Sequence, residues 1–546
     1  MELHWPSKYT WRVVGVTFIM SLCAGLFGFD TGSIGAITTM SQFQEVFGEL
    51  KPLIRGVVVS IILVPSGVTG VLAGNVSEYL SRKRTISLGA AIFAAGSAIS
   101  AASKTSLGVL IFGRCVAGTG EGLFLGILGV YLCEISPQHL RPQMLLFQQV
   151  ICTAGVALGF FFCYGSARVQ DSMAWRAPFV MQTITATIVA IAAPFMPYSA
   201  RWLLSKGRRE EAERVLDLLV GPDNIDERRE LMSTGPAAGK MSQLAAMKAL
   251  WEPGVRGRTL LGIAVNVFQQ LSGIDFVLFY APLLFEQAGL DPSTSSFIAS
   301  GVTGLILVAC SVAGTFYINR VGRRKIWLFG GTAVAFCHIV LGILYASGAA
   351  QSPVGQYAAI VFIELFAVSF TSSWANVTKL YAAEIQPSRT RGAAASLGQG
   401  MNQLVNFGVA VSGPFFLDKS SFGPYFLYGG FSALGVVFGY FFMYEVLGKS
   451  LEGIDQAFEG SAVAVSLPKI LRGANLTDIR QRKNSRSQSA TLPGETREDI
   501  RRHVMELQAI GENSVIEEDD EDEPVRPAGL SAGKPANRRP SGSREE

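Results

Sequence analysis

Charged residues inside long apolar runs are the first candidates for chemistry in this sequence. Asp30 closes the apolar run Trp11–Phe29, and Arg114 lies within the apolar segment 107–133. A charge at the centre of a lipid bilayer costs about 2.5–3.5 kcal/mol on insertion scales, so such a residue needs a partner or a function. If the two segments cross a bilayer in opposite directions, Asp30 and Arg114 meet in an ion pair. An arginine that moves away would then let the acid take up a proton. A permanent structural ion pair is the alternative.

Side-chain amides within apolar segments form a second group of candidates. They are Gln149, Gln269, Gln270, Asn402 and Asn406. Each amide both donates and accepts hydrogen bonds, which suits a neutral ligand with many hydroxyl groups. Amides also join helices within membranes, so a purely structural role is open as well.

The elements that must position these residues are predicted to be membrane-spanning helices. With 49% hydrophobic and only 16% charged residues, the chain is too apolar for a soluble protein of 546 residues. At about 20 apolar residues per crossing, the sequence predicts an all-α membrane protein with twelve transmembrane helices in two six-helix halves. The predicted helices are 12–35, 56–76, 85–103, 107–133, 143–165, 176–197, 258–287, 294–318, 326–349, 356–382, 392–417 and 423–446.

Changes of composition divide the chain into four predicted parts. Residues 1–197 form the N-terminal six-helix half and 258–458 the C-terminal half. Between them, 198–257 is a polar linker with amphipathic helical patterning, expected on the membrane surface. Residues 459–546 carry serine-rich, basic and acidic runs and are predicted to be a disordered tail.

Lysine and arginine residues are concentrated in the connections on one side of the predicted bundle. They include Arg82–Arg84, Arg141, the central linker, Arg320–Lys325 and Arg389–Arg391. Because cytoplasmic loops carry the excess of basic residues, both termini and the linker are predicted to face the cytoplasm. The first apolar run lacks a small-residue cleavage site, so it is predicted to remain as the first span of a multi-pass protein.

Several other functional classes are excluded by composition and motif. The net charge of +4 is spread over loops and the tail without an aromatic-interleaved patch, which argues against nucleic-acid binding. All seven cysteines lie in apolar segments and have neither disulfide nor metal-ligand spacing. No nucleophile–base pair, metal motif or phosphate loop points to an enzyme, and no cofactor is expected.

An internal repeat relates the two halves. The pattern Glu-Ile-x-Pro-x-x-x-Arg at 134–141 recurs at 384–391, and the Ser81-Arg82-Lys83 loop recurs as Gly322-Arg323-Arg324. Two copies of a six-helix unit are the architecture of rocking secondary transporters, which hold their substrate near the midplane between the halves.

At these motifs the chain resembles the sugar porter family of the major facilitator superfamily, and its fungal members most. The resemblance covers about residues 10–455. It rests on Phe27-Gly28-Phe29-Asp30-Thr31-Gly32, Gly113-Arg114, Gln269-Gln270-Leu271-Ser272-Gly273-Ile274 with Tyr280-Ala281-Pro282, Arg201-Trp202-Leu203-Leu204 and Gly448-Lys449-Ser450-Leu451-Glu452. It implies a monomeric plasma-membrane protein that carries a monosaccharide by alternating access.

The resemblance also implies roles for individual residues. Asp30 and Arg114 would couple sugar import to protons. A network of charges would close the cytoplasmic side, formed by Glu78, Arg82, Glu134, Arg323, Arg324 and Glu384. The alternative for these charges is that they only set the topology. Gln149, Gln269, Gln270, Asn402, Asn406 and Tyr280 would contact the sugar.

Several positions depart from the family pattern, and four of them bear most on the site and the loops. Asp275 replaces an asparagine, Lys379 and Gln403 replace tryptophans, and Ser81 replaces a glycine. Asp275 and Lys379 are included among the candidate substrate-binding residues. Three interpretations of Lys379 are open: an ion pair with Asp275, a contact to a sugar acid such as a uronate, or a side chain that extends to water.

The coarse function also has alternatives. The leading prediction is sugar:proton symport into the cell. Alternatives are an uncoupled sugar facilitator, a transporter of polyols or sugar acids, and a sugar sensor that does not transport. The tail suits trafficking or ubiquitin-ligase adaptors as readily as signalling partners.

Overall fold

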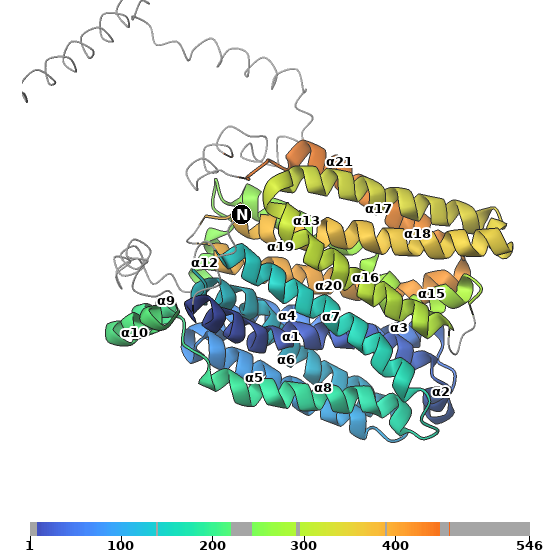
Figure 1. Ribbon diagram of the computed structural model, residues 1–546, viewed down its shortest axis with the longest axis horizontal. Coiled ribbons are helices and arrows are strands. Elements are labelled where there is room, and N and C mark those ends of the chain that lie inside the picture. The colour runs from blue at the N-terminus through green and yellow to red at the C-terminus, as the bar shows by residue number, and fades with distance from the viewer. Residues whose placement is uncertain are drawn as a thin grey trace, which may run out of the picture. The chain divides into compact units, whose positions relative to one another are not determined.

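Helices make up all of the regular structure in the part of the chain that the computed structural model describes, residues 8–137, 140–219, 243–290, 295–387, 390–447 and 458. The first six spans are α1 (Lys8–Thr39), α3 with α4 (Pro52–Ser60, Leu63–Leu80), α5 (Arg82–Ala102), α6 (Leu107–Ile135), α7 (Arg141–Ser166) and α8 (Met173–Ala192). The last six are α13 to α15 (Arg256–Leu271, Ile274–Phe279, Ala281–Gln287), α16 (Ser295–Val321), α17 (Arg323–Ala346), α18 with α19 (Pro353–Ser372, Trp374–Glu384), α20 (Arg391–Lys419) and α21 (Gly423–Phe442). Figure 1 shows these helices side by side.

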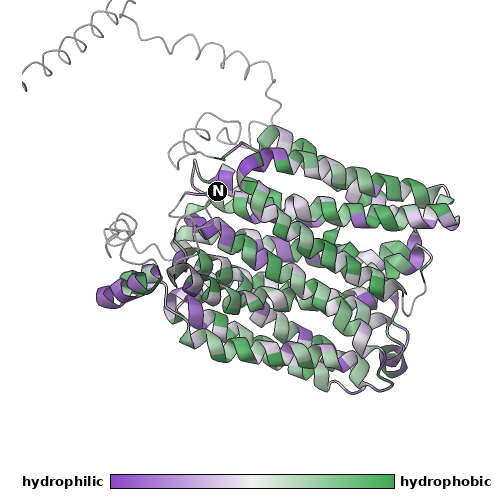
Figure 2. Ribbon diagram, viewed as in Figure 1, coloured by the Kyte–Doolittle hydropathy of each residue, from purple (hydrophilic) through white to green (hydrophobic). Residues whose placement is uncertain are grey.

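Shorter helices lie at the ends of the spans. On one side are α2 (Ser41–Phe47) and η3 (Ala349–Gln351), and on the other are η2 (Ala193–Phe195), α9 (Ala200–Ser205), α10 (Arg209–Leu219) and α12 (Gln243–Ala249). The last three occupy the predicted linker. In Figure 2, α10 is mostly hydrophilic, whereas the spans are mostly hydrophobic. The predicted tail, 459–546, lies outside the described residues.

Eleven of the described helical segments are long and apolar enough to cross a membrane. The twelfth span, α20, is 29 residues long but has a low mean hydropathy because amides lie along it. These amides are Gln399, Asn402, Gln403 and Asn406. The span with the weakest membrane signal therefore carries four side-chain amides.

Three breaks interrupt two of the spans. Gly273 adopts a φ of 78° between α13 and α14, a left-handed conformation that glycine accepts without cost. Pro282 follows Tyr280 at the start of α15, where a proline fits the first helical turn. Ser373 separates α18 from α19. These breaks let α14 and α19 tilt independently of the longer helices before them.

The repeated loops make equivalent turns in the two halves. Gly322 has a φ of 92° between α16 and α17, and Ser81 has a φ of 89° between α4 and α5. Within the described ranges, Ser81 is the one non-glycine residue with a positive φ. This serine holds a turn that favours glycine, at a cost of about 1–3 kcal/mol.

The two halves meet mainly along three pairs of spans. Helix α7 packs against α16, α20 packs against α3 and α4, and α1 packs against α14 and α15. Figure 1 shows α7 beside α16. Every polar side chain between these spans therefore lies at the interface between the two halves.

Candidate functional site

The predicted ion pair between Asp30 and Arg114 is present at the centre of the N-terminal half. Arg114 Nη1 donates to Asp30 Oδ1 at 2.9 Å, and Nη2 donates to Asp30 Oδ2 at 3.0 Å. The two residues are 3% and 1% exposed, so water does not replace either partner. A buried, bidentate arginine–carboxylate pair of this kind is both strong and geometrically specific.

Two further groups hold this pair in place. Gln182 Nε2 on α8 donates to Asp30 Oδ1 at 3.1 Å, and Arg114 Nη2 donates to the Val59 carbonyl on α3 at 2.7 Å. The site thus joins α1, α3, α6 and α8. Sequence reasoning missed Gln182, although an isolated amide in the apolar segment 176–197 was the available signal.

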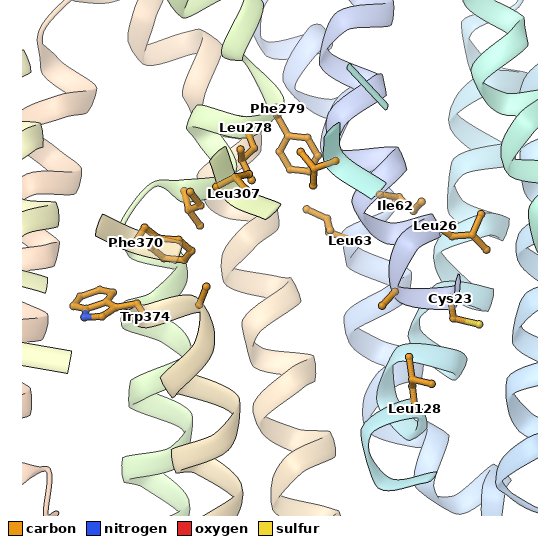
Figure 3. Close-up of a cluster of buried hydrophobic side chains, with 14 of the residues drawn as sticks. Cys23, Leu26, Ile62, Leu63, Leu128, Leu278, Phe279, Leu307, Phe370 and Trp374 are labelled. Carbon is orange, nitrogen blue, oxygen red and sulfur yellow. The ribbon is translucent and has the colours of Figure 1, made fainter. Parts of the chain in front are cut away.

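A central cavity of about 90 Å³ lies between the halves. Its wall includes the predicted residues Gln149, Gln269, Gln270, Asp275, Lys379 and Asn402. Apolar residues complete the wall, and Figure 3 shows three of them, Leu278, Leu307 and Phe370, on helices of the C-terminal half. The cavity is smaller than the roughly 300 Å³ at which ligand pockets begin. A ligand as large as those that such pockets hold would therefore need a wider cavity between the halves.

The amides of α13 and α20 form one hydrogen-bonded network at this cavity. Gln270 Nε2 donates to Asn402 Oδ1 at 3.0 Å, and Asn402 Nδ2 donates to Gln269 Oε1 at 3.0 Å and to the Asn266 carbonyl at 3.2 Å. Gln270 Oε1 is buried without a hydrogen-bond partner. The network therefore joins two helices and still offers an acceptor to a ligand.

Tyr280 and Asn406 lie outside the cavity wall. The Tyr280 hydroxyl donates to the Ala410 carbonyl at 2.8 Å, because the break at Gly273 turns the following short helix toward α20. Asn406 lies one turn beyond Asn402 and is fully buried, and neither its amide nitrogen nor its oxygen has a partner. In this conformation neither side chain faces the cavity.

Asp275 and Lys379 share the cavity wall without an ion pair between them. Asp275 is 6% exposed, whereas Lys379 is exposed. No described salt bridge of 4.0 Å or less joins the two. Of the three interpretations of Lys379, the direct pair with Asp275 is not the one that this conformation adopts.

The two halves are closely packed on the side of the membrane where α1 ends. A Cβ atom on Gly35 of α1 would lie 1.5 Å from the Phe279 carbonyl, and one on Gly56 of α3 would lie 2.4 Å from the Val411 carbonyl. Figure 3 shows Phe279 on a C-terminal helix and Ile62 and Leu63 on an N-terminal one. Beyond this contact lies a second cavity of about 600 Å³, lined by residues that include Glu49, Arg55, Glu286 and Asp418. Backbone contact thus separates the two cavities.

Comparison with known proteins identifies this arrangement. The family described as "Sugar (and other) transporter" matches residues 16–458. The chain belongs to this sugar transporter family. Its members are transporters and not enzymes, which agrees with the absence of a catalytic motif in the sequence.

Relatives across the family align with most of the chain. Sugar transport protein MST3 of rice is 29% identical, and the alignment covers 82% of this chain and 90% of the rice protein. The high glucose sensor RGT2 of Saccharomyces cerevisiae is also 29% identical over 83% of this chain, but over 61% of its own length. The xylose transporter XylE from E. coli, in a partially occluded inward-open conformation, shares the fold with a TM-score of 0.68 and 22% identity over 81% of this chain and 100% of XylE. These comparisons confirm the predicted twelve-helix fold of the major facilitator superfamily.

Ion pairs at the basic end of this sugar transporter follow the internal repeat. Arg82 donates to both oxygens of Glu134 at 3.0 and 3.3 Å, and Arg323 donates to both oxygens of Glu384 at 3.1 and 2.9 Å. Each arginine also bonds the carbonyl five residues before it, Ser77 or Ile318. The repeat thus builds the same three-helix junction twice.

The remaining predicted gate residues lie differently. Arg324 Nη2 donates to the Tyr440 carbonyl, and the Glu445 carboxylate accepts from the backbone amides of Arg323 and Arg324 at 2.9 and 3.2 Å. Glu78 is exposed, and in the described structure its carboxylate pairs with no base. The junctions in this transporter therefore depend on Glu134 and Glu384 and not on Glu78.

Proposed function

We propose that this transporter imports a monosaccharide together with protons by alternating access. The observation that carries the proposal is the buried Asp30–Arg114 pair directly behind the substrate cavity, because Thr31, the next residue, lines that cavity. A change in the charge of Asp30 would therefore affect both the cavity wall and the helices that pack behind it. The related protein XylE is described as a proton:xylose symporter, which supports coupling here.

Proton transfer at this site would loosen the junction of four helices. A proton on Asp30 removes the charge that holds Arg114, so the bidentate contact weakens and Arg114 keeps only the Val59 carbonyl on α3. Helices α1 and α3 then move independently. Since α1 packs on α14 and α3 packs on α20, this change reaches the closed contact between the halves.

The chemistry of the cavity wall favours a neutral monosaccharide. Gln149, Gln269, Gln270 and Asn402 supply donors and acceptors without net charge, as hydroxyl groups require. Lys379 is exposed and in our proposal extends into water. Competition of labelled glucose uptake by galacturonate tests this choice: strong competition that Lys379→Ala abolishes would assign the cavity to sugar acids instead.

The basic loops support the orientation in the membrane that import requires. Arg82, Arg323 and Arg391 lie at one end of the helices, and that end faces the cytoplasm of the plasma membrane in our proposal. Residues 1–197 and 258–458 are the two rocking halves and 198–257 connects them. The tail, 459–546, binds regulators such as trafficking adaptors.

Uptake in a strain without its own sugar transporters tests the proposal. Proton symport predicts faster uptake at about pH 5 than at about pH 8, and loss of accumulation when a protonophore is added. Asp30→Asn should abolish accumulation, with uptake expressed per molecule at the cell surface because the variant is also expected to be less stable. Uptake that ignores pH and protonophore, with Asp30→Asn fully active, would instead identify a facilitator.

A sensor is the second candidate, favoured by the similarity to the yeast glucose sensor RGT2. A sensor and a transporter differ in one measurement. Full surface expression without uptake of any hexose, pentose or polyol, together with sugar-dependent signalling, would replace transport by sensing.

A further inference from the structure

A buried glutamate in the N-terminal half contacts an amide of the C-terminal half. Glu121 on α6 is 0% exposed. Gln403 Nε2 on α20 donates to Glu121 Oε1 and to Ser66 Oγ on α4, both at 3.2 Å. This contact crosses the surface along which the halves move. The sequence signalled both residues separately, since Glu121 stands in an apolar segment and Gln403 replaces a tryptophan, but it did not pair them.

Two oxygen atoms without hydrogen-bond partners indicate the protonation state of Glu121 in this contact. Glu121 Oε2 and Gln403 Oε1 are both buried without a hydrogen-bond partner. Two acceptors cannot bond each other. A proton on Glu121 Oε2 turns that oxygen into a donor, which can bond the Gln403 carbonyl oxygen beside the existing bond from the Gln403 amide nitrogen to Glu121 Oε1. A carboxylate instead leaves both acceptors unpaired, which is costly in a buried site.

Charges around Glu121 do not neutralise it. The charged groups that act on it most are Asp30 on α1 and Arg114 on α6, and Arg114 is already bound to Asp30. On α7, the titratable side chain nearby is Cys152. On α4, α5 and α20 the charged residues lie at the helix ends: Glu78, Arg82, Lys83, Arg84, Arg391, Asp418 and Lys419. No described salt bridge includes Glu121.

We propose that Glu121 is a second proton-binding residue, which in its protonated form bonds the Gln403 amide and holds the two halves together. The proton comes from water and returns to it. Loss of the proton breaks the hydrogen bond from the acid, and the carboxylate then faces the Gln403 carbonyl oxygen. The halves separate at α6 and α20 as a result.

Gln403 also links this acid to the substrate. Its side chain lines the central cavity, whereas Glu121 lies behind it. A sugar hydroxyl that bonds Gln403 competes with Glu121 for the same amide. This step rests on the transport function proposed above, whereas the protonation of Glu121 does not.

Infrared difference spectroscopy of the full-length protein in lipid nanodiscs tests the protonation directly. An exposed glutamate ionises near pH 4.3, so at about pH 7 it gives carboxylate bands alone. The spectrum of the wild type minus that of Glu121→Gln should contain one carboxylic-acid carbonyl band at this pH. Carboxylate bands in its place would overturn the proposal, whether or not the protein transports sugar.

Two further variants separate the specific contact from general effects. Gln403→Leu removes the amide, so the band should persist and shift to the frequency of a more weakly bonded acid. Glu364→Gln is the matched control, because Glu364 is a half-buried acid that accepts a hydrogen bond from Thr303 within the C-terminal half. An unshifted band in Gln403→Leu would refute the link between the halves.

Uptake adds a functional readout. Glu121→Gln mimics the protonated acid and keeps an amide to bond Gln403, so we expect normal surface expression, at least a tenfold slower exchange of sugar, and a flattened pH dependence. Wild-type uptake at every pH in Glu121→Gln would show that the proton on Glu121 plays no part in the cycle.

Discussion

Replacement of Asp30 by asparagine should destabilise the protein through the charge it leaves behind. Arg114 donates two hydrogen bonds to Asp30 and one to the Val59 carbonyl, and it is 1% exposed. Removal of one partner of a buried ion pair costs about 3–5 kcal/mol, because the other charge remains unpaired. Asparagine keeps one acceptor oxygen, so we expect a loss near the lower end, about 3 kcal/mol.

A double-mutant cycle isolates this charge effect. The free energy of unfolding is measured by detergent denaturation for the wild type, Asp30→Asn, Arg114→Leu and the double variant. The double variant removes both charges, so it should be more stable than Asp30→Asn alone by about 1 kcal/mol or more. Arg82→Ala serves as control, because its pair with Glu134 is 17% and 12% exposed and should cost less. Additive losses in the cycle would refute the ion-pair argument.

Three other predictions concern the closed contact, the strained turn and the basic end. Gly35→Ala places a methyl group against the Phe279 carbonyl and should favour separation of the halves on that side, seen as faster labelling of a cysteine introduced in place of Leu283, which lines the second cavity. Ser81→Gly relieves a positive φ and should stabilise the protein by about 1 kcal/mol in thermal unfolding; no change would show that the turn is unstrained. Arg323→Gln should open the basic end and lower accumulation severalfold, whereas Glu78→Gln should transport normally, and equal effects of the two would contradict the structure.

Much of the fold and part of the site follow from the sequence alone. Spans are set by apolar length, and the ion pair of Asp30 with Arg114 follows from two charges at similar depth on neighbouring helices. The repeat predicts that Arg82 meets Glu134 and that Arg323 meets Glu384, because identical motifs occupy identical places in the two halves. Each of these ion pairs joins two helices of the same half, so it depends only on the depth of the two residues in the membrane and on the order of the helices along the chain.

Contacts that depend on rotation of a helix or on the fit between halves could not be predicted. Tyr280 points away from the cavity because the turn at Gly273 changes the direction of α14, and no spacing rule gives that angle. Asp275 and Lys379 share a cavity wall. Whether they form an ion pair depends on the depth in the membrane at which α19 begins after Ser373. Gln403 reaches Glu121 only because α20 packs on α4 and α6 across the halves.

In our proposal Asp30 and Glu121 have different roles, because their hydrogen-bond partners lie in different halves. Asp30 binds Arg114 and Gln182, all within the N-terminal half, so its protonation changes the internal rigidity of that half. Glu121 bonds Gln403 of the other half, so its protonation changes the contact between the halves. The charges of Asp30 and Arg114 both act on Glu121, so we expect a change at the Asp30–Arg114 pair to affect the proton on Glu121. If Asp30 loses its proton and recaptures Arg114, the charge nearest Glu121 is neutralised again and Glu121 keeps its own proton. The Asp30→Asn variant should consequently move the pH at which the Glu121 acid band disappears, and an unmoved band would show that the two sites titrate separately.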